Sequence, residues 1–126
     1  MSEDMPRLLL VEDEFLIRMT LAEILADDGF EVIEAATGAE ALAQMQASPP
    51  DIVLTDLNLP GGMDGFGVAR AVRQQAGGVP VLFTSGEPID PSRLGPRDRA
   101  LTKPYLPSSV GPVLREMIAR ATDPAG

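Results

Sequence analysis

A single aspartate ends a short apolar run in the middle of the chain. The segment from Ile52 to Asp56 is brief, rich in branched residues and followed by Pro60, a pattern typical of a buried strand. A carboxylate at the end of such a strand can act as a nucleophile, and attack on phosphorus would give an aspartyl phosphate. Taken alone, Asp56 has a simpler interpretation as a residue that caps a loop.

Three further polar groups each follow another apolar run. They are the acidic pair Glu12-Asp13, the hydroxyl pair Thr84-Ser85, and Lys103 before Pro104. Each has an ordinary structural explanation, namely a helix N-cap, a turn, and a surface lysine before a rigid bend. Four such groups at equivalent positions favour a shared site over separate coincidences.

The residue types of these groups suit phosphoryl transfer. Glu12, Asp13 and Asp56 would bring three carboxylates together, so the pKa of at least one should rise. A hard divalent cation relieves this repulsion, and Mg²⁺ often bridges protein carboxylates to a phosphate. Lys103, the only lysine among ten basic residues, supplies a positive centre. One hydroxyl of the Thr/Ser pair can donate to a phosphoryl oxygen.

Strand and helix patterns alternate along the chain and predict how these groups are positioned. We expect strands over 7–11, 31–35, 52–56, 79–84 and 99–102. We expect helices over 15–28, 37–47 and 65–75, and a last one from 108 or 109 to 120. This order predicts an α/β fold with a parallel sheet and helices on both faces, whose ligand site lies beyond the C-terminal ends of the strands. All four polar groups fall at those ends and should converge.

Local signals support these elements. The first helix repeats apolar residues at helical spacing, and its predicted buried face comprises Ile17, Leu21, Ile24 and Leu25. Gly29 is expected to end it as a left-handed cap. Thr37 and Glu40 match a capping box. Pro112 is compatible with the last helix only in its first turn.

Composition bounds the function. With 126 residues the chain is expected to be one domain, 1–126, with a core over 7–120, frayed ends at 1–5 and 121–126, and no output domain. It has no cysteine and no histidine, which excludes disulfides, zinc-type sites and histidine-based catalysis. A net charge of -9 disfavours direct binding of nucleic acid. No signal peptide or spanning segment is found, so we expect a cytoplasmic protein with no membrane contact.

The joint pattern resembles the receiver domain of bacterial two-component response regulators, of the stand-alone, chemotaxis-regulator-like type. Four segments carry the resemblance, in order: Val11 to Glu14, Leu54 to Pro60, Pro80 to Gly86, and Lys103 to Tyr105. The resemblance covers about residues 7–120. It implies a flavodoxin-like, doubly wound sheet of five parallel strands in the order 2-1-3-4-5.

The resemblance also implies a role for each polar residue. Asp56 corresponds to the phosphoacceptor, and Glu12 and Asp13 correspond to the acidic pair that binds Mg²⁺. Asn58 falls where the family uses a backbone carbonyl as a further metal ligand. Lys103 corresponds to the lysine that contacts the phosphate.

The switch hydroxyl of the family usually lies five residues after the proline of the fourth strand. Counting from Pro80 selects Ser85, with Thr84 as the second choice. Two features depart from the family. Ala100 stands where an aromatic residue is often coupled to this hydroxyl, and Tyr105 is the aromatic residue nearby. The interval 86–102 is short and rich in proline, so the usual fourth helix should be a turn or two at most, and residues 87–98 should be the most mobile.

The leading hypothesis is a phosphoacceptor that takes a phosphoryl group from a histidine kinase or histidine phosphotransferase and signals by docking onto an effector or by passing the group on. It would be no enzyme beyond Mg²⁺-dependent self-phosphorylation and autodephosphorylation. The alternative is a phosphorylation-independent binding module, which Ala100 and the broken fourth helix favour and the intact polar set opposes. A small hydrolase is disfavoured because Asn58, and not a carboxylate, lies two residues after Asp56.

Overall fold

The computed structural model describes residues 5–122. Of the expected frayed ends, residues 1–4 and 123–126 lie outside this range, whereas residues 121 and 122 belong to the last helix, contrary to the prediction. The strands are β1 (Arg7–Val11), β2 (Glu31–Ala35), β3 (Ile52–Asp56), β4 (Val81–Ser85) and β5 (Arg99–Thr102). The helices are α1 (Phe15–Asp27), α2 (Gly38–Ala47), α3 (Gly65–Gln75) and α4 (Val110–Thr122), with 3₁₀ turns at η2 (Pro91–Arg93) and η3 (Pro107–Ser109).

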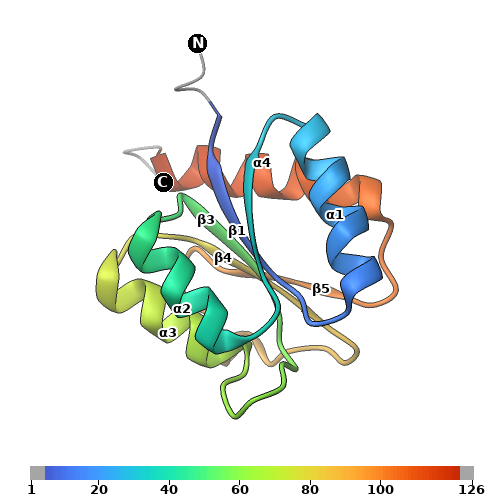
Figure 1. Ribbon diagram of the computed structural model, residues 1–126. Coiled ribbons are helices and arrows are strands. Elements are labelled where there is room, and N and C mark those ends of the chain that lie inside the picture. Colours follow the sequence, from blue (N-terminus) through green and yellow to red (C-terminus); the bar gives the residue numbers. More distant parts are fainter. Residues whose placement is uncertain (1–4, 123–126) are drawn as a thin grey trace.

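The five strands form one parallel sheet in the order β2-β1-β3-β4-β5 (Figure 1). This order confirms the predicted flavodoxin-like topology. From β1 the chain crosses first to β2 on one side and then to β3 on the other, so Leu9 is paired with both Ile33 and Val53. The order therefore reverses between β1 and β3, and a crevice opens beyond their C-terminal ends.

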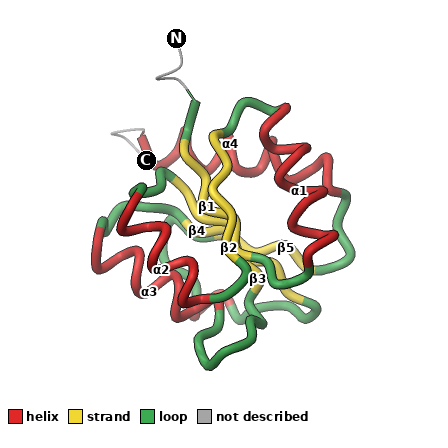
Figure 2. The backbone as a smooth tube through the Cα atoms, in the orientation of Figure 1, coloured by secondary structure: helices red, strands yellow, loops and turns green. Residues whose placement is uncertain are grey.

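Helices cover both faces of the sheet, with α1 and α4 on one side and α2 and α3 on the other (Figures 1 and 2). Successive strand residues point to opposite faces. Accordingly Leu10 and Leu54 pack with Leu25 and Leu114 on the first face. On the second face the core comprises Val11, Val53, Phe83, Met45 and Val72, among others. On α1, Leu21 and Leu25 are buried as predicted, whereas Ile17 and Ile24 are half-buried.

Strand β4 begins and ends later than predicted. The sequence pattern placed it over 79–84, whereas the strand spans Val81–Ser85. Pro80 has no N–H to donate to the sheet, and only its carbonyl takes part, accepting from the N–H of Val53 at 3.1 Å. At the other end the carbonyl of Ser85 accepts from the N–H of Lys103 at 2.7 Å, which extends the pairing.

The helix ends follow the local signals with small shifts. Gly29 has a positive φ of 98°, as predicted for a left-handed cap. The Thr37 hydroxyl accepts from the N–H of Glu40 at 3.1 Å, and the Glu40 carboxylate reaches the N–H of Ala36 at 2.8 Å, one residue before the position that a capping box predicts. The last helix begins at Val110 and not at 108 or 109, because η3 precedes it. Pro112 lies in its first turn, as expected.

The connection between β4 and β5 contains η2 and no longer helix, as the prolines predict. Two contacts hold it against α3. The guanidinium of Arg93 lies 4.0 Å from the ring centroid of Phe66, and the carboxylate of Asp98 pairs with Arg73. Asp98 also accepts from the N–H groups of Val81 at 3.2 Å and Gly95 at 2.7 Å. The greater mobility expected of residues 87–98 stays a prediction.

Candidate phosphoacceptor site

Three carboxylates meet where β1 and β3 end. One oxygen from each of Glu12, Asp13 and Asp56 lies within 4.8 Å of the other two. Glu12 and Asp56 are buried and Asp13 is exposed. Because β1 and β3 are adjacent parallel strands, the turn after one and the last residue of the other must share this edge. The convergence predicted from the sequence is therefore present for the acidic residues.

The carboxylate of Glu12 lies inside the turn that leads into α1. Its Oε2 accepts from the N–H of Glu14 at 3.1 Å. The N-cap residue is Glu14, whose own side chain makes no capping bond, so the acidic pair does not cap the helix in the ordinary way. Burial raises the pKa of Glu12, the Glu14 N–H lowers it, and the charge of Asp56 raises it again. The expected rise in one carboxyl pKa thus falls on the most buried acid of the turn.

Lys103 supplies the positive charge of the site. Its Nζ lies 3.2 Å from Oδ2 of Asp56, although the two residues are far apart in the sequence. The Asp56 side chain is 8% exposed and that of Lys103 is 32% exposed. The bond from the Lys103 N–H to the Ser85 carbonyl attaches the lysine to the end of β4, and the peptide bond to Pro104 is cis. The ammonium therefore lies in direct contact with the Asp56 carboxylate.

The two candidate hydroxyl residues point to opposite faces of β4, because neighbouring strand residues alternate. Ser85 lines a cavity of about 610 Å³ together with Leu57, Asn58 and Glu87. Its Oγ accepts from the N–H of Glu87 at 3.2 Å. Thr84 is buried and is paired with Asp56 in the sheet. Asn58 is exposed and lines the same cavity as Ser85, and its part as a carbonyl ligand stays a prediction.

The donor set at this edge fits a hard divalent cation. Among residues 5–122, the side chains that could hold such an ion here are the carboxylates of Glu12, Asp13 and Asp56. Mg²⁺ favours such ligands and binds few of them at a time, keeping several waters for exchange with a phosphate. An exposed acid beside two buried ones leaves the site open on one side.

Residues 8–93 match the family model of the response regulator receiver domain. This chain belongs to that family. Among curated relatives, it is 34% identical to the aerobic respiration control protein ArcA of Escherichia coli over 119 residues, which are 91% of this chain and 49% of ArcA. It is 32% identical to the transcriptional regulatory protein PdtaR of Mycobacterium tuberculosis over 117 residues, which are 90% of this chain and 57% of PdtaR. The chain thus spans about half the length of these relatives.

Solved structures show the same fold as this receiver domain. The chemotaxis protein CheY4 of Vibrio cholerae is 32% identical, with a TM-score of 0.81 over 90% of this chain and 98% of that one. A receiver protein from Sinorhizobium medicae has a TM-score of 0.86 at 24% identity, covering 94% of this chain and 98% of that one. Within residues 5–122 of the receiver domain, every helix is too short or too polar to cross a membrane.

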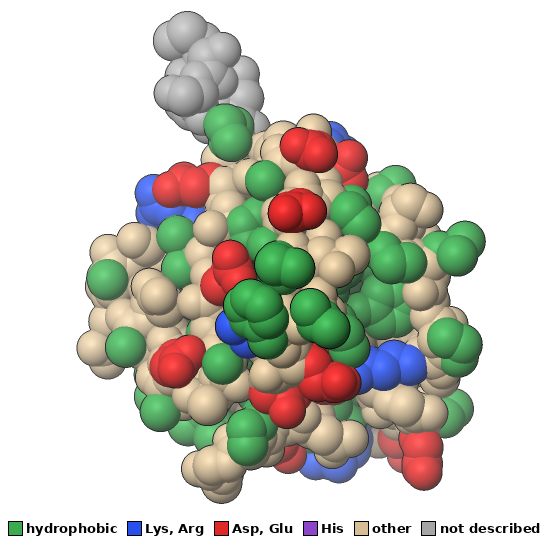
Figure 3. Space-filling model, turned by 45° about the vertical axis from the view of Figure 1, so that its right-hand side comes forward, with side chains coloured by type: hydrophobic (Ala, Val, Ile, Leu, Met, Phe, Trp, Pro, Cys, Tyr) green, Lys and Arg blue, Asp and Glu red, His purple; other side chains and the backbone are tan. Residues whose placement is uncertain are grey.

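The receiver domain also exposes a hydrophobic surface beside the acidic edge. On α1, Phe15 is 62% exposed, Leu16 69% and Met19 39%, and Leu106 before η3 is 72% exposed. Figure 3 shows hydrophobic side chains gathered in the middle of this face, with acidic side chains above and below them. Sequence reasoning missed this surface. The available signal was that Leu16 and Met19 lie off the helix face that Leu21 and Leu25 bury.

A cavity of about 430 Å³ connects this surface to the site. Its lining comes from α1, through residues that include Leu16 and Thr20, and from the segment after β5, through Lys103, Pro104 and Tyr105. Burial raises the pKa of Tyr105 to about 12, and the negative charges of Glu12 and Asp56 add to the rise. The tyrosine, whose role the sequence left open, therefore lies within electrostatic reach of the acids and remains neutral at physiological pH.

Proposed function

We propose that this receiver domain accepts a phosphoryl group on Asp56 from a phosphohistidine of a histidine kinase or histidine phosphotransferase. An oxygen of Asp56 forms the new bond to phosphorus, the bond from phosphorus to the donor imidazole nitrogen breaks, and that nitrogen keeps the electron pair. One observation carries the proposal. The buried Asp56 carboxylate lies 3.2 Å from the ammonium of Lys103 and within 4.8 Å of two further carboxylates.

Each neighbouring residue has a defined task in this proposal. Glu12, Asp13, Asp56 and the carbonyl of Asn58 would hold Mg²⁺, which neutralises charge on the transferred group when bound. Lys103 bonds a phosphoryl oxygen and balances the charge that develops during transfer. Ser85 donates its hydroxyl to another phosphoryl oxygen. The domain turns over no external substrate, because the phosphoryl group ends on the protein itself.

Phosphorylation is expected to act on the connection that follows Ser85. The Ser85 hydroxyl already accepts from Glu87, so its recruitment to a phosphoryl oxygen changes the start of this segment. Ala100 supplies no aromatic ring for the coupling, and it packs on the same core group as Ile89 and Leu94 of the connection. An effector protein that docks on this connection would bind differently to its phosphorylated and unphosphorylated conformations. A donor kinase that uses ATP implies a cytoplasmic site of action.

Intact mass measured after incubation with acetyl phosphate tests the chemistry. We expect a phosphoryl adduct on the wild type in the presence of Mg²⁺, and no adduct without Mg²⁺ or on the Asp56→Ala variant. Beryllofluoride binding, followed by amide NMR, controls for an adduct too short-lived to detect. If the wild type forms no adduct and also fails to bind beryllofluoride, the phosphorylation-independent binding module is the better account.

The hydrophobic surface of α1 is suited to docking of the protein that carries the phosphohistidine. An imidazole on a partner can approach Asp56 only if the partner lies against the acidic edge. Phe15, Leu16 and Leu106 flank that edge and are exposed, so they offer apolar area for burial against a helix of the donor. The cavity between α1 and Tyr105 could receive an apolar side chain of that helix.

Leu16→Asp is expected to slow transfer from a phosphorylated protein donor by at least about tenfold, because a charge replaces apolar contact area at the interface. Transfer from acetyl phosphate should be unchanged, since that small donor needs no docking. Labelling rates with a phosphorylated kinase or phosphotransferase that labels the wild type provide the measurement. Met5→Asp is the control, because Met5 is also exposed but precedes β1 at the opposite end of the strand. Equal slowing with both donors would contradict a docking role.

A further inference from the structure

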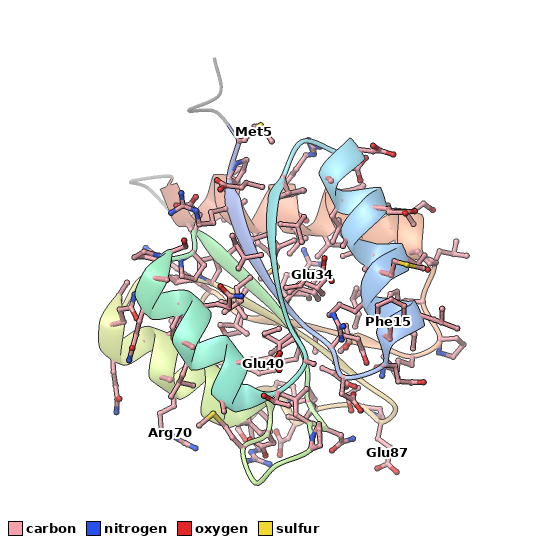
Figure 4. All side chains as sticks on the ribbon, in the orientation of Figure 1. Met5, Phe15, Glu34, Glu40, Arg70 and Glu87 are labelled. Atoms are coloured by element: carbon pink, nitrogen blue, oxygen red, sulfur yellow. The ribbon has the colours of Figure 1, made fainter. Side chains whose placement is uncertain are left out.

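Arg18 joins the acidic turn to two other parts of the molecule. Its Nη1 donates to the carbonyl oxygen of Glu12 at 2.8 Å, and its Nε lies 3.2 Å from Oε1 of Glu34 on β2. Its guanidinium carbon lies 5.6 Å from the centroid of the Phe15 ring. The Arg18 side chain is only 16% exposed, which is low for an arginine on an outer helix. Figure 4 labels Glu34 on β2 and Phe15 at the start of α1, which are the two side chains that Arg18 contacts.

The contact with Glu12 has consequences for the site, because Glu12 and Asp13 share one peptide unit. The Glu12 N–H donates to the carbonyl of Ala35 at 3.0 Å, and the Glu12 carbonyl accepts from Arg18. The main chain is thus held from β2 on one side and from α1 on the other. Loss of the Arg18 bond would leave the backbone at Glu12 and Asp13 free to shift, and a shift of the backbone moves their carboxylates relative to Asp56.

Arg18 affects the acidic turn through a hydrogen bond to its main chain and not through its charge. The charges that act on the pKa of Glu12 are those of Asp56, Lys103 and Asp13. Arg18 bonds the main-chain carbonyl and has its own carboxylate partner in Glu34, so its charge is matched away from the metal-binding acids. A planar guanidinium can serve both partners at once, whereas a lysine ammonium at the same place is a single point charge.

We infer that Arg18 is a positioning residue for the divalent-cation site, holding the Glu12 carbonyl so that the carboxylates of Glu12 and Asp13 face Asp56. The inference rests on the proposed function, in which Mg²⁺ binds there. Residues that orient metal ligands typically change metal affinity about 10- to 100-fold when they are replaced. Arg18 also contacts Phe15 of the hydrophobic surface of α1, so it connects that surface to the proposed metal site.

The chain contains a matched control for this residue. Arg7 at the start of β1 pairs with Glu31 of β2 at 3.4 Å and donates to the carbonyl of Pro49 at 3.3 Å. It therefore makes the same kinds of contact as Arg18, an ion pair to β2 and a bond to a main-chain carbonyl. It does so at the opposite end of the same two strands, away from the acidic turn.

The test is a Mg²⁺ titration of the full chain, in which the amide NMR signals of Asp13 and Asp56 report binding. Arg18→Met is expected to raise the Mg²⁺ dissociation constant at least about tenfold. Arg18→Lys should restore part of the affinity, and Glu34→Gln should produce a smaller loss by releasing one side of the guanidinium. Arg7→Met should leave the dissociation constant within about twofold of the wild type while lowering the melting temperature to a similar extent as Arg18→Met.

Where Arg18→Met folds, two results would overturn the inference. One is an Arg18→Met variant that binds Mg²⁺ as tightly as the wild type. The other is an equal loss of affinity in Arg7→Met, which would indicate that lower stability of the whole domain weakens Mg²⁺ binding. If Arg18→Met does not fold, Arg18→Lys and Glu34→Gln decide the question in the same assay, and unchanged affinity in both overturns it. A wild type that binds no Mg²⁺ would refute the proposed metal site as well, so the two failures are distinguishable.

Discussion

Replacing Lys103 with methionine is expected to slow phosphorylation of Asp56 by acetyl phosphate about 100- to 1,000-fold, the usual cost of removing a donor that stabilises developing charge. The ammonium lies 3.2 Å from Oδ2 of Asp56, and the backbone of Lys103 is held by the bond from its main-chain N–H to the Ser85 carbonyl oxygen. It is also the only lysine in the chain. No neighbouring lysine can therefore replace it.

Mg²⁺ binding separates this effect from a folding defect. Removing a positive charge beside three carboxylates makes the site more negative, so Lys103→Met should bind Mg²⁺ at least as tightly as the wild type while reacting more slowly. Single-turnover rates from intact mass and a Mg²⁺ titration provide the two readouts. Arg99→Met, which breaks an exposed pair with Glu116, serves as the control and should react normally. A Lys103→Met rate within about threefold of the wild type would contradict the role given to this lysine.

Asp98→Ala is expected to reduce the free energy of unfolding by about 2–4 kcal/mol, because each polar group left without its partner away from water costs about 1–3 kcal/mol. The Asp98 side chain is 2% exposed and accepts from the N–H groups of Val81 and Gly95 besides pairing with Arg73. Its removal leaves two main-chain donors and a guanidinium without their acceptor. The loss is a large share of the 5–15 kcal/mol typical of a whole domain.

Urea unfolding followed by circular dichroism measures this loss. Asp98→Asn keeps an oxygen acceptor of the same shape and should lose less stability than Asp98→Ala. Glu116→Ala removes two exposed ion pairs and should change the free energy of unfolding by no more than about 1 kcal/mol. If Asp98→Ala and Glu116→Ala were equally stable, the carboxylate would not anchor the connection between β4 and β5.

The anchoring of the connection by Asp98 limits where a conformational change can occur. The connection begins at Ser85, in the proposed phosphoryl site, and Asp98 attaches its far end to α3 and β4. Between them, Arg93 lies over Phe66. A change that begins at Ser85 is therefore confined to a segment that is attached at both ends, and an effector could recognise its altered surface without rearrangement of the sheet.

Sequence patterns predicted the sheet well because they depend on local rules. The apolar runs at 7–11 and 52–56 are strands with the predicted bounds. The observed strand order is the one that the resemblance to receiver domains implied. The same rules bring Glu12, Asp13, Asp56 and Lys103 to one edge. Errors arose where a proline or a short turn decides a boundary, as at the start of β4 and before α4.

Contacts between elements were not predictable in the same way. Periodicity shows that Leu21 and Leu25 are buried, but it does not show which neighbour leaves Leu16 and Met19 uncovered. Arg18 and Asp98 are charged residues like many others in the sequence. Their partners, Glu34 and Arg73, are 16 and 25 residues away, and nothing local distinguishes these pairs from exposed ones.

By itself, therefore, the sequence determined the α/β fold, the family and the set of residues at the acidic edge, because strand patterns, turn residues and motif spacing are properties of neighbouring residues. The tertiary structure alone decided the environment of that set. It buried Glu12 and Asp56 while leaving Asp13 exposed, attached Lys103 to the end of β4, and placed Arg18 behind the acidic turn. Burial and hydrogen bonding between distant elements depend on how the helices pack on the sheet, which single-residue patterns do not encode.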